Sequence, residues 1–565
     1  MVLLCEQSLA RWLYEPYWIP PRVVERKRMN TPDTFDYVIV GAGAAGCLLA
    51  NRLSENGRHS VCLLESGPPD RNPFIHIPAG FIKVGYDPRY TWPFETAPSW
   101  GTAGRRVTAR LGRTLGGSSA INGFNYTRGA ASDYDGWAAL RNPGWSYDEV
   151  LPYFLRTERR IGGDDAPHRG REGLLPITDC DWRHPLCEGF IRSAESLGIG
   201  PAGDYNLGVQ AGAGYYQRWI HRGRRVSAAT AFLKPAQGRA NLEVRTGAHA
   251  TSIVFSGRRA VGVQVRMQAG GAQGTVHARR EVILCAGAIN SPKLLQLSGV
   301  GPLEWLHSLG VKPLHALEGV GRRLQDHFMV RSVVRVQGVP TINNTARGWR
   351  LCLEIGKWAL GRPSVLAISP SVAYAFAASR PGLPEADLQF HFSPGSYASG
   401  IAGRLDSFPG MTLGFYQMRP ASHGHVRVLS TDPFAPPEIQ PSYMEREEDR
   451  RVVIDGLRLT RRILHAPALL PYVERDEAPP AHAMSDEDLL EYARQRGGTA
   501  WHFMGTCRMG PAQDESAVVD AQLRVHGLEG LRVADASVMP AMPSGNTGAP
   551  TMMIAEKAAD MLLQT

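Results

Sequence analysis

The sequence contains no apolar run of the length that a membrane-spanning helix requires, which is about 20 residues. It also contains no block of five or more like charges, and its densest basic cluster is Arg26-Lys27-Arg28. The formal charge of +9 is therefore dispersed, which is typical of a solvated surface and not of a nucleic-acid site. We expect no transmembrane segment and no nucleic-acid partner.

Cysteine is scarce, with eight residues in 565 and no C-x-x-C pair, which argues against a zinc site. We expect no bound metal. Cys47, Cys62 and Cys285 lie in apolar runs and are predicted to be small core residues. Free cysteines of this kind indicate a reducing compartment, so we expect a cytoplasmic protein, with peripheral membrane association as an open alternative.

The first 33 residues match nothing that follows. Leu3-Leu4 is soon interrupted by Glu6 and Arg11, which does not fit a secretory signal. Met29 stands just before the first predicted strand and could be the true start. We expect residues 1–33 to form a poorly ordered extension, and an amphipathic surface anchor is the alternative.

The richest pattern in the chain runs from residue 36 to residue 65. Residues 37–40 are apolar and predict a buried parallel strand, and residues 41–46 then match G-x-G-x-x-G. Residues 47–53 have apolar side chains at helical spacing, and residues 61–64 predict a second strand that ends at Glu65. The order of strand, glycines, helix, strand and acid is the context that a dinucleotide-binding motif requires.

Each part of this motif has a physical role. Gly41 permits the tight turn, Gly43 lets the backbone approach a pyrophosphate, and Gly46 lets the helix pack closely on the strand. The helix N-terminus offers unpaired N–H groups to the phosphates. Glu65 can accept hydrogen bonds from a ribose diol, and its charge would repel a 2′-phosphate. The stretch predicts an adenine dinucleotide and does not distinguish NAD from FAD.

A second glycine-rich segment, residues 112–123, contains Gly116-Gly117-Ser118-Ser119. Such a loop can donate hydrogen bonds to an anionic ligand, although a flexible glycine loop is the simpler interpretation of the segment alone. Residues 112–122 resemble the first signature of the glucose–methanol–choline (GMC) family of FAD-dependent oxidoreductases, and residues 287–302 resemble the second. Residues 321–327 and 498–561 extend the resemblance, which covers about residues 35–565 and is strongest to the choline dehydrogenase and alcohol dehydrogenase branch. It implies FAD as the cofactor.

The length exceeds what one hydrophobic core supports, so we expect two domains. The fold class expected from the resemblance is α/β, α+β overall: a Rossmann-like FAD-binding domain with a parallel sheet, interleaved with a substrate domain built on an antiparallel sheet. We expect residues 34–330 to form mainly the FAD-binding domain, with substrate-domain insertions at about 150–230. Residues 331–485 should form mainly the substrate domain, and residues 486–565 should return to the FAD domain with the catalytic pair.

Several strands and helices can be predicted within this scheme. Residues 241–244 and 260–267 alternate like antiparallel strands, and residues 281–285 should return to the dinucleotide sheet. Residues 388–392 and 425–429 are the clearest strands of the second domain, whose sheet should cover the reactive side of the flavin with helices on its other face. Two further helices are predicted, at 486–495 with Ser485 as its cap and at 552–563.

The motifs and the resemblance together imply a set of residues around FAD: Gly41, Ala42, Gly43, Ala45, Gly46, Glu65, Gly116, Gly117, Ser118, Asn122, Ala248, Ala286, Asp535, Ala536, Asn546 and Thr547. Asp535 follows a predicted strand and is expected to hold the ribityl or pyrophosphate region. Some relatives attach FAD covalently through a histidine at the position of Ile121. Because isoleucine has no nucleophilic atom, we expect FAD to be bound non-covalently.

The resemblance also implies the catalytic residues. The family's active-site histidine falls on His502, and its partner, which is histidine or asparagine in the family, is Asn546 here. Asparagine does not titrate near neutral pH, so His502 should be the base and Asn546 should orient the substrate hydroxyl. Trp501 and Phe503 could shape the substrate pocket or simply fill the core. Cys507 lies five residues after His502, but no motif supports a Cys/His nucleophile there.

The expected reaction is oxidation of a small-molecule alcohol, in which a base accepts the hydroxyl proton as the flavin N5 accepts hydride. The rate should rise with pH through a group near the histidine range. One alternative is a protein like the hydroxynitrile lyases, with a structural FAD, and another is a binding protein with an inert flavin. The electron acceptor, O2 or a quinone or another acceptor, stays open, as do the oligomeric state and the substrate, of which choline is one candidate.

Overall fold

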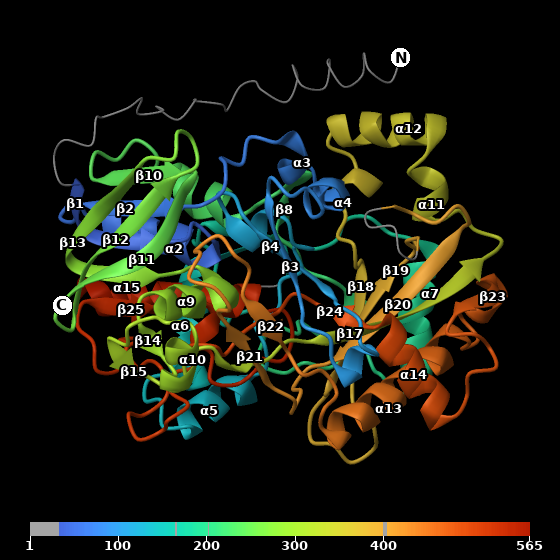
Figure 1. Cartoon of the computed structure of the whole chain (residues 1–565). Coiled ribbons are helices and arrows are strands. Elements are labelled where there is room, and N and C mark those ends of the chain that lie inside the picture. The colour runs from blue at the N-terminus through green and yellow to red at the C-terminus, as the bar shows by residue number, and fades with distance from the viewer. Residues whose placement is uncertain (1–32, 164–165, 202, 399–403, 565) are drawn as a thin grey trace.

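The computed structural model describes residues 33–163, 166–201, 203–398 and 404–564. The expectation for the extension at residues 1–33 therefore lies outside the described residues, except that Asp33 begins the first strand, β1. The described chain contains two seven-stranded sheets, which lie side by side in Figure 1. This arrangement confirms the expected fold class, a parallel dinucleotide sheet combined with an antiparallel one.

The first sheet has the strand order β10-β2-β1-β13-β12-β11, and β25 also pairs with β13. Its strands are β1 (Asp33–Val40), β2 (Val61–Glu65), β10 (Leu242–Thr246), β11 (Ala248–Ser256), β12 (Arg259–Met267), β13 (Gln273–Leu284) and β25 (Leu531–Val533). β1, β2, β10, β13 and β25 are parallel, whereas β11 and β12 extend the sheet as an antiparallel pair.

The parallel strands are apolar because both faces of this sheet are covered. Val38, Ile39 and Leu63 are fully buried, as expected for strands that have helices on either side. Helix α2 (Ala44–Ser54) follows β1 and packs against the last helix, α15 (Gly548–Leu563). The Tyr37 hydroxyl donates a hydrogen bond to the carbonyl of Leu562 at 3.0 Å, so the two ends of the described chain meet in one core.

The second sheet has the order β23-β17-β20-β19-β18-β7, and β24 also pairs with β17. Its strands are β7 (Gly212–Tyr215), β17 (Phe328–Val336), β18 (Ala373–Ala377), β19 (Leu388–Ser393), β20 (Gly410–Gln417), β23 (Val473–Ala478) and β24 (Gly498–Thr499). Every pairing in it is antiparallel. The prediction of an antiparallel sheet in this region is confirmed.

The two faces of the second sheet differ because side chains alternate along each strand. On β19, Phe390 and Phe392 point to the helix side, where Phe392 stacks on Phe190 of α7 (Pro185–Ser196) with ring centroids 4.7 Å apart. Helix α13 (Glu447–Leu464) packs on the same side of β17 and β20. His391 and Ser393 point the other way and line a cavity. The sheet thus has a packed apolar face and a polar face that is free to meet a ligand.

The structure confirms some local predictions and corrects others. The antiparallel strand β12, the strand β13 beside β1, and the helix α14 (Asp486–Arg496) capped by the Ser485 side chain are as expected. Residues 241–244 were expected to be antiparallel, but β10 pairs parallel with β2. Their alternating pattern reflects the half-buried position of an edge strand and not the direction of pairing.

Two other predictions are corrected. Residues 425–429 do not join the second sheet, because β21 (Gly424–Arg427) pairs with β16 (Arg322–Leu324) and β22 (Glu438–Gln440) in a separate three-stranded sheet. The carbonyl of Val426 accepts a hydrogen bond from the Gln296 side chain on α9 (Gly287–Leu297), which holds β21 away from the large sheet. The last helix, α15, begins at Gly548 and not at residue 552, because Pro550 is tolerated in a first helical turn.

Candidate active site

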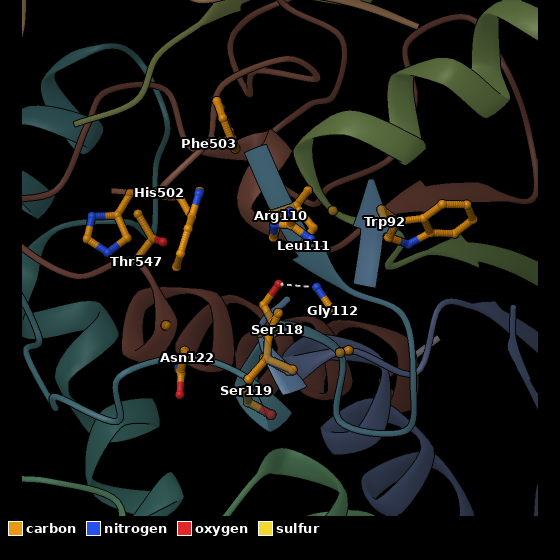
Figure 2. Close-up of a pocket in the computed structure, with 18 of the residues that line it drawn as sticks. Trp92, Arg110, Leu111, Gly112, Ser118, Ser119, Asn122, His502, Phe503 and Thr547 are labelled. Carbon is orange, nitrogen blue, oxygen red and sulfur yellow. Dashed lines mark hydrogen bonds between the residues drawn. The ribbon is translucent and has the colours of Figure 1, made fainter. Parts of the chain in front are cut away.

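A cavity of about 850 Å³ lies between the two sheets and is lined by residues of both. It extends from Glu65, at the end of β2, to His502, and Figure 2 shows part of its wall. Thirteen of the sixteen residues predicted around FAD line it: Gly41, Gly43, Ala45, Glu65, Gly117, Ser118, Asn122, Ala248, Ala286, Asp535, Ala536, Asn546 and Thr547. His502, Trp501 and Phe503 line the same cavity.

The other three predicted residues lie behind this wall. Ala42 is fully buried, and its N–H donates to the Glu65 carboxylate at 3.0 Å. A Cβ on Gly46 would lie 1.9 Å from the Gly41 carbonyl oxygen, so only glycine lets helix α2 pack this close to the loop. The Gly116 N–H donates to the Ala42 carbonyl at 2.8 Å. These residues shape the loops and do not face the cavity.

The two glycine-rich loops form one surface. Gly41 has φ +102°, and a Cβ there would lie 2.6 Å from the carbonyl oxygen of Cys285. A Cβ on Gly117 would lie 2.7 Å from the Cα of Gly43, so the two loops touch through their glycines. Bare backbone of this kind lets a pyrophosphate approach closely. The loops therefore fit the phosphates of an adenine dinucleotide.

Two buried acids stand beside these loops. The Glu65 carboxylate accepts hydrogen bonds from the N–H groups of Ala42 and Gly67, and burial raises its pKa to about 7. The Asp535 carboxylate accepts hydrogen bonds from the Gly287 N–H, the Ser291 hydroxyl and the Ser537 N–H. Burial raises the pKa of Asp535 as well. Both side chains are fixed at strand ends, where a dinucleotide-binding sheet carries its ligand-binding groups.

The structure brings His502 and Asn546 together although 44 positions separate them. The Nε2 atom of His502 lies 3.2 Å from the Nδ2 atom of Asn546. His502 follows β24, and its backbone N–H donates to the Asp326 carboxylate at 2.7 Å. Asn546 stands just before α15. Each residue is thus placed by an element from a different part of the core.

A third residue, His327, completes this arrangement. Its Nε2 atom lies 2.7 Å from the Met418 carbonyl, which can only accept, so Nε2 carries the hydrogen. The Nδ1 atom of His327 must then accept from the Nδ1 atom of His502, 2.9 Å away. This assignment leaves the Nε2 atom of His502 with a lone pair, which accepts from the Asn546 amide. The network selects the tautomer that a base requires.

Sequence reasoning gave His327 no role. It ends the segment 321–327 that carried part of the resemblance, and Asp326, which holds the backbone of His502, stands next to it. The position immediately before β17 was the available signal, because it places the side chain on the same face as Met329 and Arg331.

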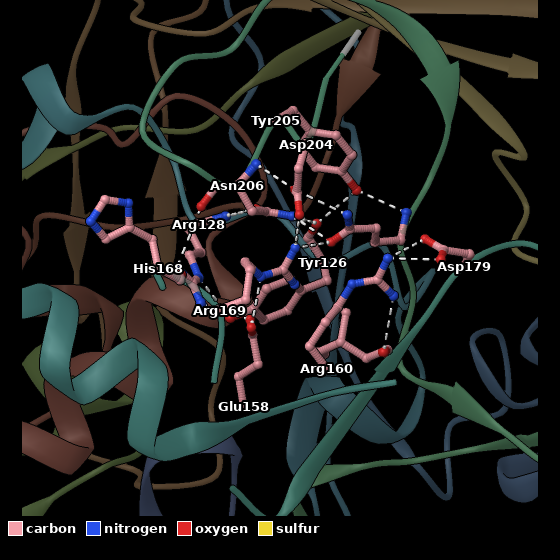
Figure 3. Close-up of polar contacts among 12 residues, drawn as sticks. Tyr126, Arg128, Glu158, Arg160, His168, Arg169, Asp179, Asp204, Tyr205 and Asn206 are labelled. Carbon is pink, nitrogen blue, oxygen red and sulfur yellow. Dashed lines mark hydrogen bonds and ion pairs between the residues drawn. The ribbon is translucent and has the colours of Figure 1, made fainter. Parts of the chain in front are cut away.

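The Asn546 amide is also held in one orientation. Its Oδ1 atom accepts from the Thr127 hydroxyl at 3.1 Å and from the Gln389 amide at 3.4 Å, which turns Nδ2 toward His502. The segment that carries Thr127 is anchored by a buried network around the next residue (Figure 3). Arg128 pairs with the Glu158 carboxylate at 2.9 Å, and its N–H donates to the Asn206 side chain at 2.8 Å.

Burial and neighbouring histidines keep this centre neutral. Burial lowers the pKa of His502 well below its ordinary value, and His327 and His391 lower it further. Burial also lowers the pKa of His327 to about 4. Burial raises the pKa of Asp326 to about 6, opposed by hydrogen bonds from Thr499 and from other donors. His502 is therefore a neutral imidazole at neutral pH, with its titration displaced to lower pH.

The remaining candidate residues have clear positions. Phe503 is buried, whereas Trp501 is part-exposed and donates from its indole N–H to the Thr108 carbonyl at 3.2 Å. Ile121 lines the cavity, and Cys507 is fully buried with its pKa raised well above the ordinary value, which does not suit a nucleophile.

Two kinds of feature are absent from the described chain. Its His, Cys, Asp and Glu residues form no group of three that could hold a metal ion. None of the helices in the described ranges is long and apolar enough to cross a membrane.

The chain is similar to several known proteins. Oxygen-dependent choline dehydrogenase of Photobacterium profundum is 39% identical over 539 residues, which cover 95% of this chain and 94% of that protein. The protein of the same name from Chromohalobacter salexigens is 41% identical, with coverage of 94% and 96%. The crystal structure of pyridoxine 4-oxidase from Mesorbium loti has a TM-score of 0.84 and 31% identity, and covers 94% of this chain and 99% of that one.

Two family models, both described as GMC oxidoreductase, match the chain, the N-terminal one over residues 35–329 and the C-terminal one over residues 420–555. The relatives and the solved structure above match nearly the whole chain and carry oxidoreductase names, and none supports the lyase alternative. The chain belongs to the GMC oxidoreductase family, whose members are FAD-dependent enzymes that act on CH–OH groups.

Proposed function

We propose that this chain oxidises an alcohol to an aldehyde or ketone with His502 as the general base and Asn546 as the residue that orients the substrate hydroxyl. The observation that carries the proposal is the hydrogen-bond chain from Met418 through His327 to His502, which leaves the Nε2 lone pair of His502 facing Asn546. FAD-dependent oxidation at a CH–OH group is the chemistry of the family, and when bound the flavin accepts hydride from the carbinol carbon.

The protein's own part in the reaction is to move one proton and to hold the carbinol. The hydroxyl of the substrate replaces the direct hydrogen bond between the Nε2 atom of His502 and the Nδ2 atom of Asn546, which lie 3.2 Å apart, and takes both atoms as its partners. The Asn546 amide donates to the hydroxyl oxygen, and His502 accepts the hydroxyl proton as the C–H bond breaks. A positioned base contributes roughly 10²–10⁴-fold to the rate of such a step.

FAD is proposed to bind non-covalently, with its phosphates at the glycine loops and its adenosine toward Glu65. The fit rests on the touching loops of Gly43 and Gly117, where a Cβ would fill the space, and on the buried carboxylates of Glu65 and Asp535. Ile121 lines the cavity where some relatives carry the attaching histidine, and it has no atom that could form the bond.

The proposed division of the chain follows the two sheets. Residues 34–330 form mainly the FAD-binding domain, and residues 331–485 form mainly the substrate domain. β7 supports an insertion at 150–230, because it pairs with β18 of the second sheet. β25 supports the return of 486–565 to the first sheet, since it pairs with β13. β17 begins at Phe328, slightly before the proposed boundary.

We propose a cytoplasmic enzyme that touches a membrane surface through helix α12 (Gly348–Ala359), with a membrane quinone as electron acceptor and O2 as the competing candidate. The outer face of α12 exposes Trp349, Leu353 and the following Leu360, which are 70%, 55% and 75% exposed. The exposed Arg350 adds positive charge to this helix, whereas Lys357 is ion-paired with Glu354 at 2.6 Å. An apolar stripe beside basic residues is typical of helices that lie in a membrane interface.

The catalytic assignment is tested by anaerobic flavin reduction with a panel of alcohols. We expect His502→Ala to slow reduction by roughly 10²-fold or more, because it removes the base assigned to take the proton. Asn546→Ala should slow it less, since it removes a positioning hydrogen bond worth about 1–3 kcal/mol. Both variants should retain full FAD content. A His502→Ala enzyme that is reduced at nearly the wild-type rate would overturn the assignment.

A further inference from the structure

On the substrate side of the cavity, the guanidinium of one arginine has no hydrogen-bond or ion-pair partner among the described residues. Arg331 lies on β17 and lines the cavity, and no hydrogen bond or ion pair to its guanidinium is found among the residues that the structure describes. Its neighbours include the phenol groups of Tyr86, Tyr397 and Tyr492, and burial lowers its pKa. The side chain is nevertheless solvent-accessible, which fits a guanidinium that faces the cavity interior.

The backbone makes room for this side chain. On β17, Arg331 pairs with Gly414 of β20, and Gly414 pairs with His391 of β19, so the three residues form one row across the sheet. A Cβ at Gly414 would lie 3.2 Å from the Cγ of Arg331. The stem of the arginine therefore packs closely over Gly414, where a larger residue would push it aside, and all three residues line the cavity.

Two more polar groups on this face are unsatisfied. The Nε2 atom of His391 and the hydroxyl of Ser393 are buried and have no hydrogen-bond partner in the described chain. Both residues line the cavity from β19. The other ring nitrogen of His391 lies 3.0 Å from the Tyr216 hydroxyl, which is nearer to it than to the Phe390 carbonyl at 3.3 Å. Donation by Tyr216 to this nitrogen leaves Nε2 as an N–H donor.

Among the described residues, no carboxylate lines the end of the cavity near Arg331. Among the described residues that line the cavity, only Glu65 and Asp535 carry carboxylates, and both stand at the dinucleotide side. A solvent-accessible guanidinium that faces a cavity without a nearby carboxylate has its hydrogen-bond donors free for an anionic ligand. Arginine binds a carboxylate through two parallel hydrogen bonds, which makes it well suited to such a ligand.

We propose that the substrate is an alcohol that carries a carboxylate, bound through Arg331 with His391 and Ser393, while its carbinol lies at His502 and Asn546. This inference rests on the proposed function and names its substrate class. It also separates this chain from its relatives named for choline, because Arg331 would repel a quaternary ammonium group placed here.

The spacing along the strand sets the length of the proposed substrate. His327, which holds His502, stands just before β17 and precedes Arg331 by four residues, which in an extended chain separates their Cα atoms by roughly 14 Å. After allowance for both side chains, a ring-sized spacer fits between carbinol and carboxylate. 4-(Hydroxymethyl)benzoate has that form, and its methyl ester and the matching trimethylammonium alcohol supply neutral and cationic analogues of similar shape.

The test compares these alcohols by anaerobic flavin reduction. We expect the carboxylate to have a kcat/KM at least tenfold above that of its methyl ester, with the trimethylammonium analogue slowest. Arg331→Met should remove this preference by lowering the carboxylate's value about 10- to 100-fold while changing the ester's less than threefold. Arg331→Glu should reverse the order of anion and cation.

The matched control is Arg335→Gln, because Arg335 lies on the same strand but is ion-paired with Glu477 and does not line the cavity. It should keep the carboxylate preference. A second readout needs no turnover: 4-methylbenzoate should perturb the flavin spectrum of the wild type and bind at least tenfold more weakly to Arg331→Met.

Equal rates for acid and ester in the wild type, or an unchanged ratio in Arg331→Met, would overturn the inference. A tenfold preference for 4-(hydroxymethyl)benzenesulfonate would overturn the carboxylate assignment. If no alcohol of any charge reduces the wild-type flavin, the proposed function fails, and the 4-methylbenzoate titration still decides whether Arg331 forms an anion site.

Discussion

At the scale of single residues, the chemistry of His502 depends on groups that stand behind it. The Met418 carbonyl fixes the tautomer of His327, and His327 fixes the tautomer of His502. Thr127 and Gln389 turn the amide of Asn546, so that its donor faces the histidine. The family resemblance implied both members of the pair, and the structure places them in hydrogen-bond contact. The sequence could not predict the residues behind them, because contacts between positions 175 residues apart leave no local pattern.

The pH dependence of flavin reduction follows from the environment of His502. Burial and two neighbouring histidines lower its pKa well below 6.5, so the expectation of a titration in the ordinary histidine range is corrected to a lower pH. In the proposed mechanism the neutral imidazole is the active form, so the rate should be flat from pH 7 to 9 and fall only in more acidic solution. Stopped-flow reduction across pH 4.5–9 measures this.

Stability sets the lower limit of that experiment. The folded-state pKa values of His327 and His391 are lowered to about 4 and about 3, so below pH 6.5 the unfolded chain binds protons that the folded chain does not. The free energy of unfolding therefore falls as the pH drops toward these values. Circular dichroism at each pH separates unfolding from titration of the base. A rate that rises through pH 6.5–7.5 in a folded enzyme would contradict the neutral-base assignment.

At the scale of elements, the predictions that succeeded used two independent signals. β1, α2 and β2 were found because hydrophobic period and glycine spacing agree. β10 and β21 were misplaced because alternation reports one exposed face and does not report which strand lies alongside. The polar face of β19, with His391 and Ser393, was invisible for a related reason: a strand pattern does not say whether its polar side meets solvent or a cavity.

Helix α12 offers a test of the proposed membrane contact. Its inner face is held by Trp358, whose indole donates to the Gly223 carbonyl at 2.7 Å, while Trp349 and Leu353 point outward. We expect the protein to float with vesicles of anionic phospholipid at low salt, and Trp349→Ser with Leu353→Ser to lower the bound fraction at least fivefold.

A matched control changes an exposed apolar residue elsewhere, Leu429→Ser, which should leave binding unchanged. Flavin reduction by substrate should be the same in all variants, because α12 does not line the cavity. Reoxidation by a vesicle-embedded quinone should slow in the double variant. Failure of the wild type to float, together with rapid reoxidation by O2, would favour the O2-linked alternative.

At the scale of the whole molecule, the cavity lies between two separately built cores. One core centres on the parallel strands and α15, and the other on the antiparallel sheet with α7 and α13. The cavity draws Gly43 and Glu65 from the first sheet and Arg331 and His391 from the second. A cofactor that fills it would touch the first core along its length and contact the substrate side at one end. FAD should therefore hold the two sheets in a fixed relative position, in addition to supplying the redox chemistry of the reaction.

Removal of FAD tests both the stabilising role of the cofactor and the mode of its attachment. Because the group binds the folded chain, its release should lower Tm, and at a thousandfold excess over Kd its binding contributes about 4 kcal/mol to stability. Acid precipitation should release all the yellow cofactor into the supernatant, since Ile121 offers no nucleophile at the attachment position. Reloading the apoprotein should restore the holoenzyme Tm.

The His502→Ala variant should show the same shift in Tm, because His502 is assigned to the substrate hydroxyl and not to the phosphates. Flavin that stays in the washed pellet would contradict non-covalent binding, and identical Tm values for apoprotein and holoenzyme would contradict a stabilising cofactor between the sheets.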